Sequence, residues 1–446
     1  MQRKSKDEQE TNMSKTRIVV IGAGFGGLAV ALGLRQARDV ELTIVDKQNH
    51  HLFQPLLYQV ATAALSPAEI AAPIRTILRG QRNARVFLDE VIGVDTGAKR
   101  VRLKSGVGLD YDRLVIATGA RHSYFGHDDW AEFAPGIKTI DDATRVRAQV
   151  LSALERAETE RQQMPETRGR QLSFVVIGGG PTGVEMAGAI AELTRHATEM
   201  EFRYITGACV RVLLVEAGPR LLAAFPEALS AKAKASLEQL GVEVRLGAPV
   251  TAIDATSVTV AGARVPVAAT IWAAGVQASP AASWLGVIGD RAGRVPVGPD
   301  LTVPGLPDVY VIGDTAAVTG ADGKPVPGVA PAAKQQGQYV ARAIRARGAG
   351  RAITTPFAYK NYGNLATIGR QRAVADFGWT TLSGFAAWFV WSTAHLYYLT
   401  DFRSRLIVGA QWVWSYFTFD RGARLITGID GEMPKLGWSP PVKRAA

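Results

Sequence analysis

The sequence predicts an α/β fold that contains the same strand–turn–helix–strand unit twice, followed by a C-terminal region of different character. A β-branched run leads into a G-x-G-x-x-G pattern at Gly22, and a similar run leads into a second such pattern at Gly178. A third observation is the concentration of aromatic and basic residues after Arg351. The two glycine patterns predict parallel sheets, and the C-terminal composition predicts a surface that contacts another phase or molecule.

The first unit begins with the apolar run Arg17–Ile21, which predicts a buried strand. The glycines that follow it are Gly22, Gly24 and Gly27. A helix-forming stretch over 28–36 and a second strand over 40–45 complete the unit, which ends at Asp46. In such a unit the glycines allow a tight turn and close approach of a pyrophosphate, and the acid binds a ribose. The complete unit therefore predicts a Rossmann-like dinucleotide site.

The second unit repeats this order after the strand 174–177. Its glycines are Gly178, Gly180 and Gly183. A helical stretch over 184–195 follows, and the strand 210–215 ends at Glu216, with residues 196–208 expected to extend the helix or form an insertion. A terminal glutamate repels a 2′-phosphate, so NADH is favoured over NADPH, although nearby Arg220 leaves NADPH open.

Two dinucleotide modules in one chain indicate hydride transfer from a nicotinamide to a flavin. Between the modules, Tyr111–Gly119 predicts a strand that ends in Ala117-Thr118-Gly119, and Val309–Asp314 predicts a strand that ends in Gly313-Asp314. Together with the first glycine unit, these segments resemble the two-dinucleotide-binding flavoproteins. The resemblance implies an FAD-binding domain that is interrupted by an NAD-binding domain.

Within that superfamily the chain resembles the type II NADH dehydrogenases, which are single-chain NADH:quinone oxidoreductases that do not pump protons. The resemblance extends from about Arg17 to Ile426. The segments on which it rests are Phe53–Ala61, Gly180–Glu185, Trp272–Val276, Gly363–Gly369 and Thr418–Gly422. It implies a peripheral, monotopic protein at the cytoplasmic side of the cell inner membrane.

The resemblance implies a role for individual residues. Those expected to hold FAD non-covalently are Gly22, Gly24, Phe25, Gly26, Gly27, Asp46, Val91, Ala117, Thr118, Gly119, Gly313 and Asp314. Those expected to hold NADH are Gly178, Gly180, Gly183 and Glu216, and Gly275 is also expected to bind a cofactor. Glu185 is expected to face the nicotinamide and to be catalytic; its alternative role is that of a surface acid favoured by the helix dipole.

The quinone site implied by the resemblance comprises Ala330, Pro331, Lys334 and Gln335. Many members of the family have glutamine where this chain has Pro331, so only Gln335 retains the expected amide and is expected to be catalytic. Gln335 as a polar residue of a helix surface is the alternative.

The single cysteine, Cys209, excludes a redox-active cysteine pair and an intramolecular disulfide, and fits a reducing compartment. Disulfide reductases and sulfide:quinone oxidoreductases use cysteines beside the flavin, so electrons are expected to leave by another route. A small buried role at the start of a strand is expected for Cys209. The six histidines have no metal-ligand spacing, so no metal site is expected.

The formal net charge is +11, and the residues from 351 onward contain 11 Lys/Arg against 5 Asp/Glu. Two aromatic stretches, Leu382–Leu399 and Leu406–Phe419, lie among these charges. Tryptophan, tyrosine and arginine favour the membrane interface, so we expect two interfacial helices that bind the membrane surface. A single membrane span, a subdomain core and a homodimer face are the alternatives. Nucleic-acid binding is not expected, because no basic helix or stacking platform accompanies the charge.

The predicted organisation is a disordered tail over residues 1–15, an FAD-binding domain over 16–125 and 286–350, an NADH-binding domain over 126–285, and a membrane-associating region over 351–446. The leading hypothesis is transfer of two electrons from NADH to a membrane quinone. The alternatives are a reductase of a small protein electron carrier, such as a ferredoxin, and a dinucleotide-responsive membrane scaffold with little turnover.

Overall fold

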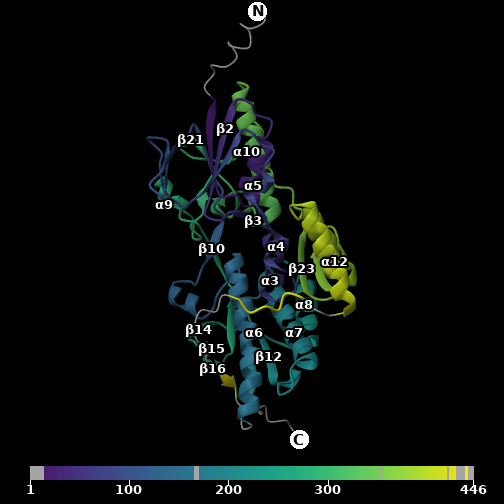
Figure 1. Cartoon of the computed structure of the whole chain (residues 1–446). Helices are drawn as coiled ribbons and strands as arrows, with labels where there is room; N and C mark the ends of the chain where they lie inside the picture. The colour runs from purple at the N-terminus through teal and green to yellow at the C-terminus, as the bar shows by residue number, and fades with distance from the viewer. Residues whose placement is uncertain (1–14, 165–169, 352–353, 419–420, 428–436, 440–446) are drawn as a thin grey trace, which may run out of the picture. The chain divides into compact units, whose positions relative to one another are not determined.

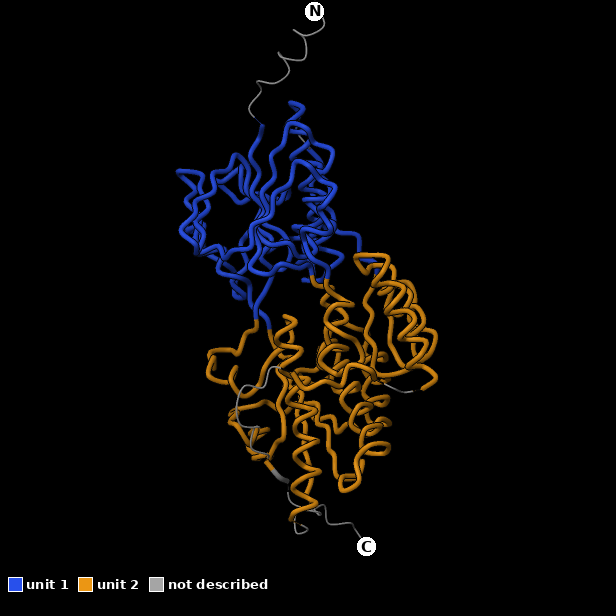
Figure 2. Tube along the Cα trace, viewed as in Figure 1, with its two compact units in different colours: residues 1–51, 72–121, 276–362 blue, residues 52–71, 122–275, 363–446 orange. Residues whose placement is uncertain are grey.

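The computed structural model describes residues 15–164, 170–351, 354–418, 421–427 and 437–439. The chain forms two compact units (Figure 2). Unit 1 comprises Met1–His51, Ala72–Arg121 and Val276–Tyr362, and unit 2 comprises Leu52–Ala71, His122–Gly275 and Gly363–Ala446. The predicted disordered tail, residues 1–15, lies outside the described residues except for Lys15.

Unit 1 is organised around a six-stranded sheet with the order β20-β21-β9-β1-β2-β5. Its strands are β1 (Thr16–Ile21), β2 (Val40–Asp46), β5 (Ala84–Leu88), β9 (Arg113–Ile116), β20 (Thr302–Val303) and β21 (Leu306–Val311). All neighbours are parallel except β20 and β21. The β-branched residues of β1 are buried, as expected for a parallel strand covered on both faces. This confirms the strand predicted from the first unit.

Helix α2 (Phe25–Gly33) packs against α10 (Ala330–Gly348) (Figure 1). Gly337 permits this close packing, because a Cβ at that position would lie 2.3 Å from the Gly26 carbonyl oxygen. The helix predicted over 28–36 begins earlier, at Phe25, since the last turn of the glycine pattern is already helical. Both α2 and α10 therefore belong to unit 1, together with the first glycine turn.

The remaining elements of unit 1 are short. They are α5 (Ile74–Ile77), the antiparallel sheet of β6 (Val91–Asp95), β7 (Arg100–Leu103) and β8 (Gly108–Asp110), then β18 (Val276–Ala278), α9 (Ala281–Leu285), β19 (Val295–Pro296), η5 (Gly313–Thr315) and β22 (Ala316–Ala317). The chain passes between the units at β3 (His50–Leu52), β4 (Ala71–Pro73) and β10 (Ala120–His122).

Unit 2 contains the second parallel sheet, with the order β13-β12-β11-β17. Its strands are β11 (Gln171–Ile177), β12 (Val210–Val215), β13 (Val242–Arg245) and β17 (Ala269–Trp272), and β26 (Trp438–Ser439) pairs with β11 in the antiparallel direction. The predicted strands 174–177 and 210–215 are confirmed. The helix predicted over 184–195 is α7 (Pro181–Met200), which continues into the segment expected to extend it.

Other elements complete this part of unit 2 (Figure 1). They are η2 (Asp128–Glu132), α6 (Ile140–Gln163), η4 (Gly207–Cys209), α8 (Glu227–Gln239) and the antiparallel sheet of β14 (Val250–Ile253), β15 (Ser257–Val260) and β16 (Ala263–Pro266). Helix α6 begins at a capping box, in which Thr139 Oγ1 accepts from the Asp142 amide at 3.1 Å.

The C-terminal region packs within unit 2. It comprises the antiparallel sheet of β23 (Asn364–Gly369), β24 (Arg372–Asp376) and β25 (Thr381–Gly384), followed by α11 (Phe385–Tyr398) and α12 (Phe402–Thr418). Strand β23 lies against α7, where a Cβ on Gly188 would be 1.7 Å from the Ile368 carbonyl oxygen. The two helices predicted here are present, although residues 382–384 belong to a strand. Within the described ranges, no helix has the length and apolarity needed to cross a membrane.

Residues 52–71 also belong to unit 2, and they form η1 (Gln54–Leu56), α3 (Leu57–Ala61) and α4 (Pro67–Ile70). Helix α3 packs against α6 and α7. The compact units therefore divide the chain differently from the predicted domains. Residues 52–71 belong to unit 2 and not to unit 1, because every residue of α3 is buried and α3 packs against helices of unit 2.

Candidate functional site

The first glycine turn has the geometry of a phosphate-binding turn. Gly22 has φ +95°, and a Cβ there would lie 2.4 Å from the Ala117 carbonyl oxygen. A Cβ on Gly27 would lie 1.8 Å from the Gly22 carbonyl oxygen, so α2 can pack this closely only at glycine. The Cβ position of Gly24, in contrast, faces open space, with no atom within 4 Å. Gly24 therefore leaves room at the helix N-terminus for a pyrophosphate.

Asp46 lies at the end of β2 and holds this turn. Its Oδ2 accepts from the Ala23 amide at 2.6 Å, and its Oδ1 accepts from the Gln48 amide at 2.8 Å. Buried His51 lies 2.9 Å through Nδ1 from the Ala23 carbonyl oxygen, and its ring meets the Phe25 ring edge-on at 5.1 Å. Burial lowers the pKa of His51, which favours a neutral ring. His51 was not predicted from the sequence.

The two other flavoprotein motifs meet at the ends of adjacent parallel strands, β9 and β21. Thr118 Oγ1 lies 3.2 Å from Thr315 Oγ1, which donates to the Gly119 carbonyl oxygen at 3.0 Å. The Gly313 amide donates to buried Gln336 Oε1 at 2.6 Å. These contacts bring together the ends of the two motifs, which comprise Ala117, Gly119, Gly313 and Asp314. Val91 is buried at the start of β6 in the same unit. Gln336 was missed because nothing in the local sequence distinguishes it from its neighbours.

The second glycine turn, in unit 2, repeats the first. Gly178 has φ +113°, and a Cβ on Gly183 would lie 1.8 Å from the Gly178 carbonyl oxygen. Gly180 again has no atom within 4 Å of its Cβ position. Glu216 holds the turn as Asp46 does, since its Oε2 accepts from the Gly179 amide at 2.5 Å. Both turns therefore have an open position where a dinucleotide phosphate fits, and both have an acid at the end of the second strand.

Gly275 follows β17, in the unit that contains the second glycine turn. A Cβ at this position would lie 2.5 Å from the Phe125 ring, so glycine is required for that approach. Arg220 is engaged elsewhere: its guanidinium donates to the carbonyl oxygens of Phe225 and Ala223, both at 2.7 Å, and to Ser230 Oγ at 3.1 Å.

The predicted quinone-site residues lie in the first turns of α10. Ala330 and Pro331 are partly exposed, and Lys334 is exposed. Both polar atoms of the Gln335 side chain bind the backbone of Lys360. Nε2 donates to the Lys360 carbonyl oxygen and Oε1 accepts from the Lys360 amide, each at 2.9 Å. This pair of bonds fixes the segment around Lys360 to the helix.

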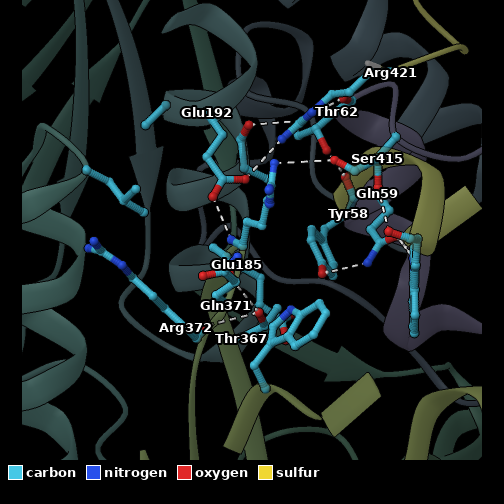
Figure 3. Close-up of a pocket in the computed structure, with 18 of the residues that line it drawn as sticks. Tyr58, Gln59, Thr62, Glu185, Glu192, Thr367, Gln371, Arg372, Ser415 and Arg421 are labelled. Atoms are coloured by element: carbon cyan, nitrogen blue, oxygen red, sulfur yellow. Dashed lines mark hydrogen bonds and ion pairs between the residues drawn. The ribbon is translucent and has the colours of Figure 1, made fainter. Parts of the chain in front are cut away.

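A cavity of about 560 Å³ lies within unit 2 and is lined by residues of α3, α7, the β23–β24 hairpin, α11 and α12 (Figure 3). One face of α7 contributes residues at helical spacing: Glu185, Ala189, Glu192, His196 and Glu199. The aromatic and hydroxyl side chains that line it include Tyr58, Trp388, Trp391, Ser392, Trp412 and Tyr416. The cavity is therefore lined mainly by aromatic side chains on the side of α11 and α12, and by titratable side chains on the side of α7.

Glu185 lines this cavity from α7, and its pKa differs from the ordinary value of a carboxyl group. Burial raises its pKa to about 8, opposed by a backbone hydrogen bond with Thr367. The side chain is partly buried, which differs from the exposed position expected of a surface acid at a helix N-terminus. At neutral pH the side chain is mostly a neutral carboxylic acid, which can donate a proton.

Arg421 and Glu192 form a partly buried ion pair in the wall of the cavity. Arg421 donates to Glu192 Oε2 at 3.2 Å and to the carbonyl oxygens of Thr62 at 2.9 Å and Ala189 at 3.1 Å (Figure 3). Glu192 Oε1 accepts from the Arg370 amide at 2.6 Å. The pair thus joins α3, α7 and two C-terminal segments, and sequence reasoning missed it because its members are far apart in the chain.

Cys209 differs from the expected buried apolar role. It ends η4, is partly exposed, and accepts from Arg161 Nη1, with Thr206 Oγ1 at 3.3 Å. Burial opposes ionisation, but the hydrogen bonds from Thr206 and Arg161 outweigh it and lower the pKa of the thiol. The expectation was wrong because Arg161, from α6, supplies a charge that the sequence around Cys209 does not reveal. In the described part of the chain, no cluster of three or more metal-binding side chains occurs.

Comparison with protein families gives two matches. Residues 16–337 match the family described as pyridine nucleotide-disulphide oxidoreductase, and residues 362–421 match the NDH2 C-terminal domain. The first match spans both glycine turns, and the second spans β23 to α12 together with Arg421.

Curated relatives cover nearly the whole chain. A type II NADH:quinone oxidoreductase of Mycobacterium tuberculosis, Ndh, is 45% identical over 92% of this chain and 90% of its own. A second from that organism, NdhA, is 44% identical over 92% of this chain and 89% of its own. The structure of NDH2 from Plasmodium falciparum in complex with NADH superposes with a TM-score of 0.82 at 22% identity, covering 92% of this chain and 99% of that one. At that identity the structural match supports the fold.

Proposed function

Because the chain belongs to the pyridine nucleotide-disulphide oxidoreductases, and within them to the type II NADH:quinone oxidoreductases, we propose that Glu185 supplies a proton as the enzyme passes two electrons from NADH to a quinone. The observation on which this role rests is a partly buried carboxylic acid that lines the cavity of unit 2 and whose pKa burial raises.

The residues of the two turns fit their dinucleotides. In unit 1, Gly22, Gly24 and Gly27 with Asp46 would hold FAD, together with Thr118 and Asp314. In unit 2, Gly178, Gly180, Gly183 and Glu216 would hold NADH. The open positions at Gly24 and Gly180 support this assignment, because a phosphate needs space at the helix N-terminus. FAD, when bound, supplies the two-electron chemistry, and the protein orients the reactants.

The balance of the reaction calls for a proton donor. NADH provides two electrons and one proton as hydride, whereas a quinone takes up two electrons and two protons to become a quinol. The second proton comes from solvent, and a neutral acid inside a cavity can hold it where it is needed. Glu185 has a pKa near the working pH, which suits repeated loading and release.

The geometry favours NADH over NADPH. The Glu216 carboxylate at the end of β12 would repel a 2′-phosphate. Arg220 is the nearby cation in the sequence that could neutralise such a group, but three hydrogen bonds hold it to the 223–230 segment. Reorienting it toward a phosphate would cost those bonds.

For the quinone itself, the side chain of Pro331 has no hydrogen-bond donor, and the amide of Gln335 is paired with Lys360. Contacts by Ala330, Pro331 and Lys334 would therefore be mainly steric or electrostatic. Gln335 is better placed to position the α10 segment than to bind the quinone oxygen, and this modifies the role expected for it from the resemblance.

The described surface of α11 and α12 supports attachment to a membrane surface, and the side that we propose is the cytoplasmic side of the cell inner membrane. Large apolar side chains exposed there are Phe385, Phe389, Tyr397, Phe402, Leu406, Val413, Trp414 and Phe417. Arg403 and Arg405 are also exposed at the start of α12. Apolar rings beside arginines match an interface of acyl chains and lipid phosphates better than a second copy of the chain, for which matching acids would be expected.

The test is a comparison of the wild type with Glu185→Gln. Quinone-dependent turnover of the wild type should fall as the pH rises through about 8, because Glu185 loses its proton. The variant should turn over about 10²-fold more slowly, and its pH profile should lack the fall at alkaline pH, the alkaline limb. Rapid mixing should show that NADH still reduces its flavin. A variant with wild-type turnover and an unchanged limb would rule out this role.

A further inference from the structure

A chain of hydrogen bonds runs from α12 to the cavity. Trp412 Nε1 donates to Gln59 Oε1 at 2.8 Å, and Gln59 Nε2 donates to the Tyr58 hydroxyl oxygen at 2.8 Å (Figure 3). Trp412, Gln59 and Tyr58 all line the cavity to which Glu185 belongs. The chain thus runs from the helix with the exposed aromatic face to Tyr58, which lines the same cavity as the acid proposed to supply the proton.

The direction of this chain is fixed by its first member. An indole N–H can only donate, so the oxygen of the Gln59 amide must face Trp412 and its nitrogen must face Tyr58. The Tyr58 oxygen therefore accepts a hydrogen bond from Gln59. Its own proton is then free to be donated on the cavity side.

The environment keeps that proton on Tyr58. Burial raises the pKa of Tyr58 well above its ordinary value, and the negative charge of Glu185 raises it further. Both Tyr58 and Glu185 line the cavity (Figure 3). Tyr58 thus remains a hydrogen-bond donor across the whole range in which Glu185 titrates.

We propose that Tyr58, oriented by Gln59 and Trp412, donates a hydrogen bond to the Glu185 carboxylate that remains after proton transfer. The inference rests on the proposed function of Glu185. A donor to the charged form of an acid lowers its pKa, so Tyr58 offsets part of the effect of burial and sets the pH at which Glu185 is reloaded. Gln59 and Trp412 are positioning residues that act through Tyr58.

Other charged and titratable groups also face the cavity. They are Glu192, Arg195, His196 and Glu199 of α7, Arg370 and Arg372 of the β23–β24 hairpin, Tyr416 of α12, and Arg421. Arg421 is paired with Glu192, and Arg370 lies over the Tyr416 ring at 4.9 Å. The variants proposed below leave all of these groups in place, so a change in titration can be assigned to the hydrogen-bond chain.

The test measures the alkaline limb of quinone-dependent turnover in the holoenzyme with a soluble quinone analogue. Tyr58→Phe should move the limb upward by about one pH unit, because the carboxylate loses a donor. Trp412→Phe should move it by about half as much, because the Gln59 amide can then rotate. The double variant should match Tyr58→Phe alone, since Trp412 acts only through Tyr58.

Gln59→Leu provides a second variant, of similar size and without charge. It removes the amide that orients the Tyr58 hydroxyl, so the donor to Glu185 is no longer held in place and the limb should again move upward. Trp379→Phe is the matched control, because Trp379 is 86% exposed in the turn between β24 and β25. Its limb should coincide with that of the wild type.

The outcomes separate this inference from the proposed function. A limb that persists in Glu185→Gln contradicts the role of Glu185 itself. A limb that depends on Glu185 but stays in place in both Tyr58→Phe and Gln59→Leu overturns only the role of Tyr58. Shifts that add in the double variant would show that Trp412 acts independently, which contradicts the hydrogen-bond chain.

Discussion

Replacing Arg421 with methionine should destabilise unit 2 more than any exposed substitution. Methionine keeps the length of the side chain but removes the charge that pairs with Glu192 and the donors to the Thr62 and Ala189 carbonyl oxygens. The Arg421 side chain is only 13% exposed, and burial lowers its pKa, so water replaces few of the lost contacts.

The expected cost is about 3 kcal/mol, the lower end of the range for removing one partner of a buried ion pair, because the Glu192 side chain is 25% exposed. At about 2 °C per kcal/mol for a unit of this size, the midpoint of thermal unfolding should fall by roughly 6 °C. Tryptophan fluorescence is a suitable probe, because all tryptophans except Trp284 belong to unit 2.

Arg403→Met is the matched control, since Arg403 is exposed on α12, and its midpoint should change little. Adding Glu192→Gln to Arg421→Met should recover part of the loss, because no unpaired charge then remains buried. Equal midpoints for Arg421→Met and Arg403→Met would refute the reasoning.

Three further predictions concern cofactor binding, pH and membranes. Gly27→Ala should lose the flavin absorbance, whereas Gly183→Ala should keep it and lose reduction by NADH, because each Cβ would lie 1.8 Å from a carbonyl oxygen of its own turn. His395 stacks on Trp391 at 4.1 Å, and burial lowers its pKa to about 4. Unit 2 should therefore lose up to roughly 3 kcal/mol as the pH falls from about 6.5 through about 4, and His395→Phe should flatten that loss in denaturant titrations followed by fluorescence. Phe417→Glu should weaken cosedimentation with anionic vesicles at least about tenfold, because an exposed ring on α12 becomes a charge.

Each of these predictions has a control in the same chain. Gly97→Ala should bind both nucleotides, because the nearest atom to its Cβ lies at 3.6 Å. His127→Phe should keep the wild-type acid sensitivity, since His127 is exposed. Met200→Glu, on α7, should leave vesicle binding intact. Flavin loss in both glycine variants, an unchanged acid transition in His395→Phe, or unaltered vesicle binding in Phe417→Glu would contradict the respective prediction.

The glycine turns were predictable because their determinants are local. A β-branched run, three glycines at fixed spacing and an acid at the end of the next strand describe the two turns almost completely, and the structure confirms the strands and helices around them. The hydrogen bonds that Asp46 and Glu216 make to their own glycine turns were not predictable. Asp46 and Glu216 each bind an amide of their own glycine turn, a contact that depends on the register between neighbouring strands.

The cavity of unit 2 was not predictable from local patterns. Its polar residues come from segments far apart in the chain, and Glu192 and Arg421 are separated by 229 positions. The Phe53–Ala61 segment was noticed only through its resemblance to a family, and its geometry explains the pattern: Tyr58 and Gln59 both make hydrogen bonds in the cavity. Such pairings arise from packing, which single-sequence periodicity does not encode.

The most direct test of the central claim is NADH oxidation by the purified, detergent-solubilised holoenzyme, with and without a soluble quinone analogue, while the flavin spectrum is followed. The expected result is flavin bleaching by NADH alone and sustained turnover only with quinone, with one quinol formed for each NADH consumed. Flavin reduction without quinone-dependent turnover would contradict the claim and would favour a small protein as the electron acceptor.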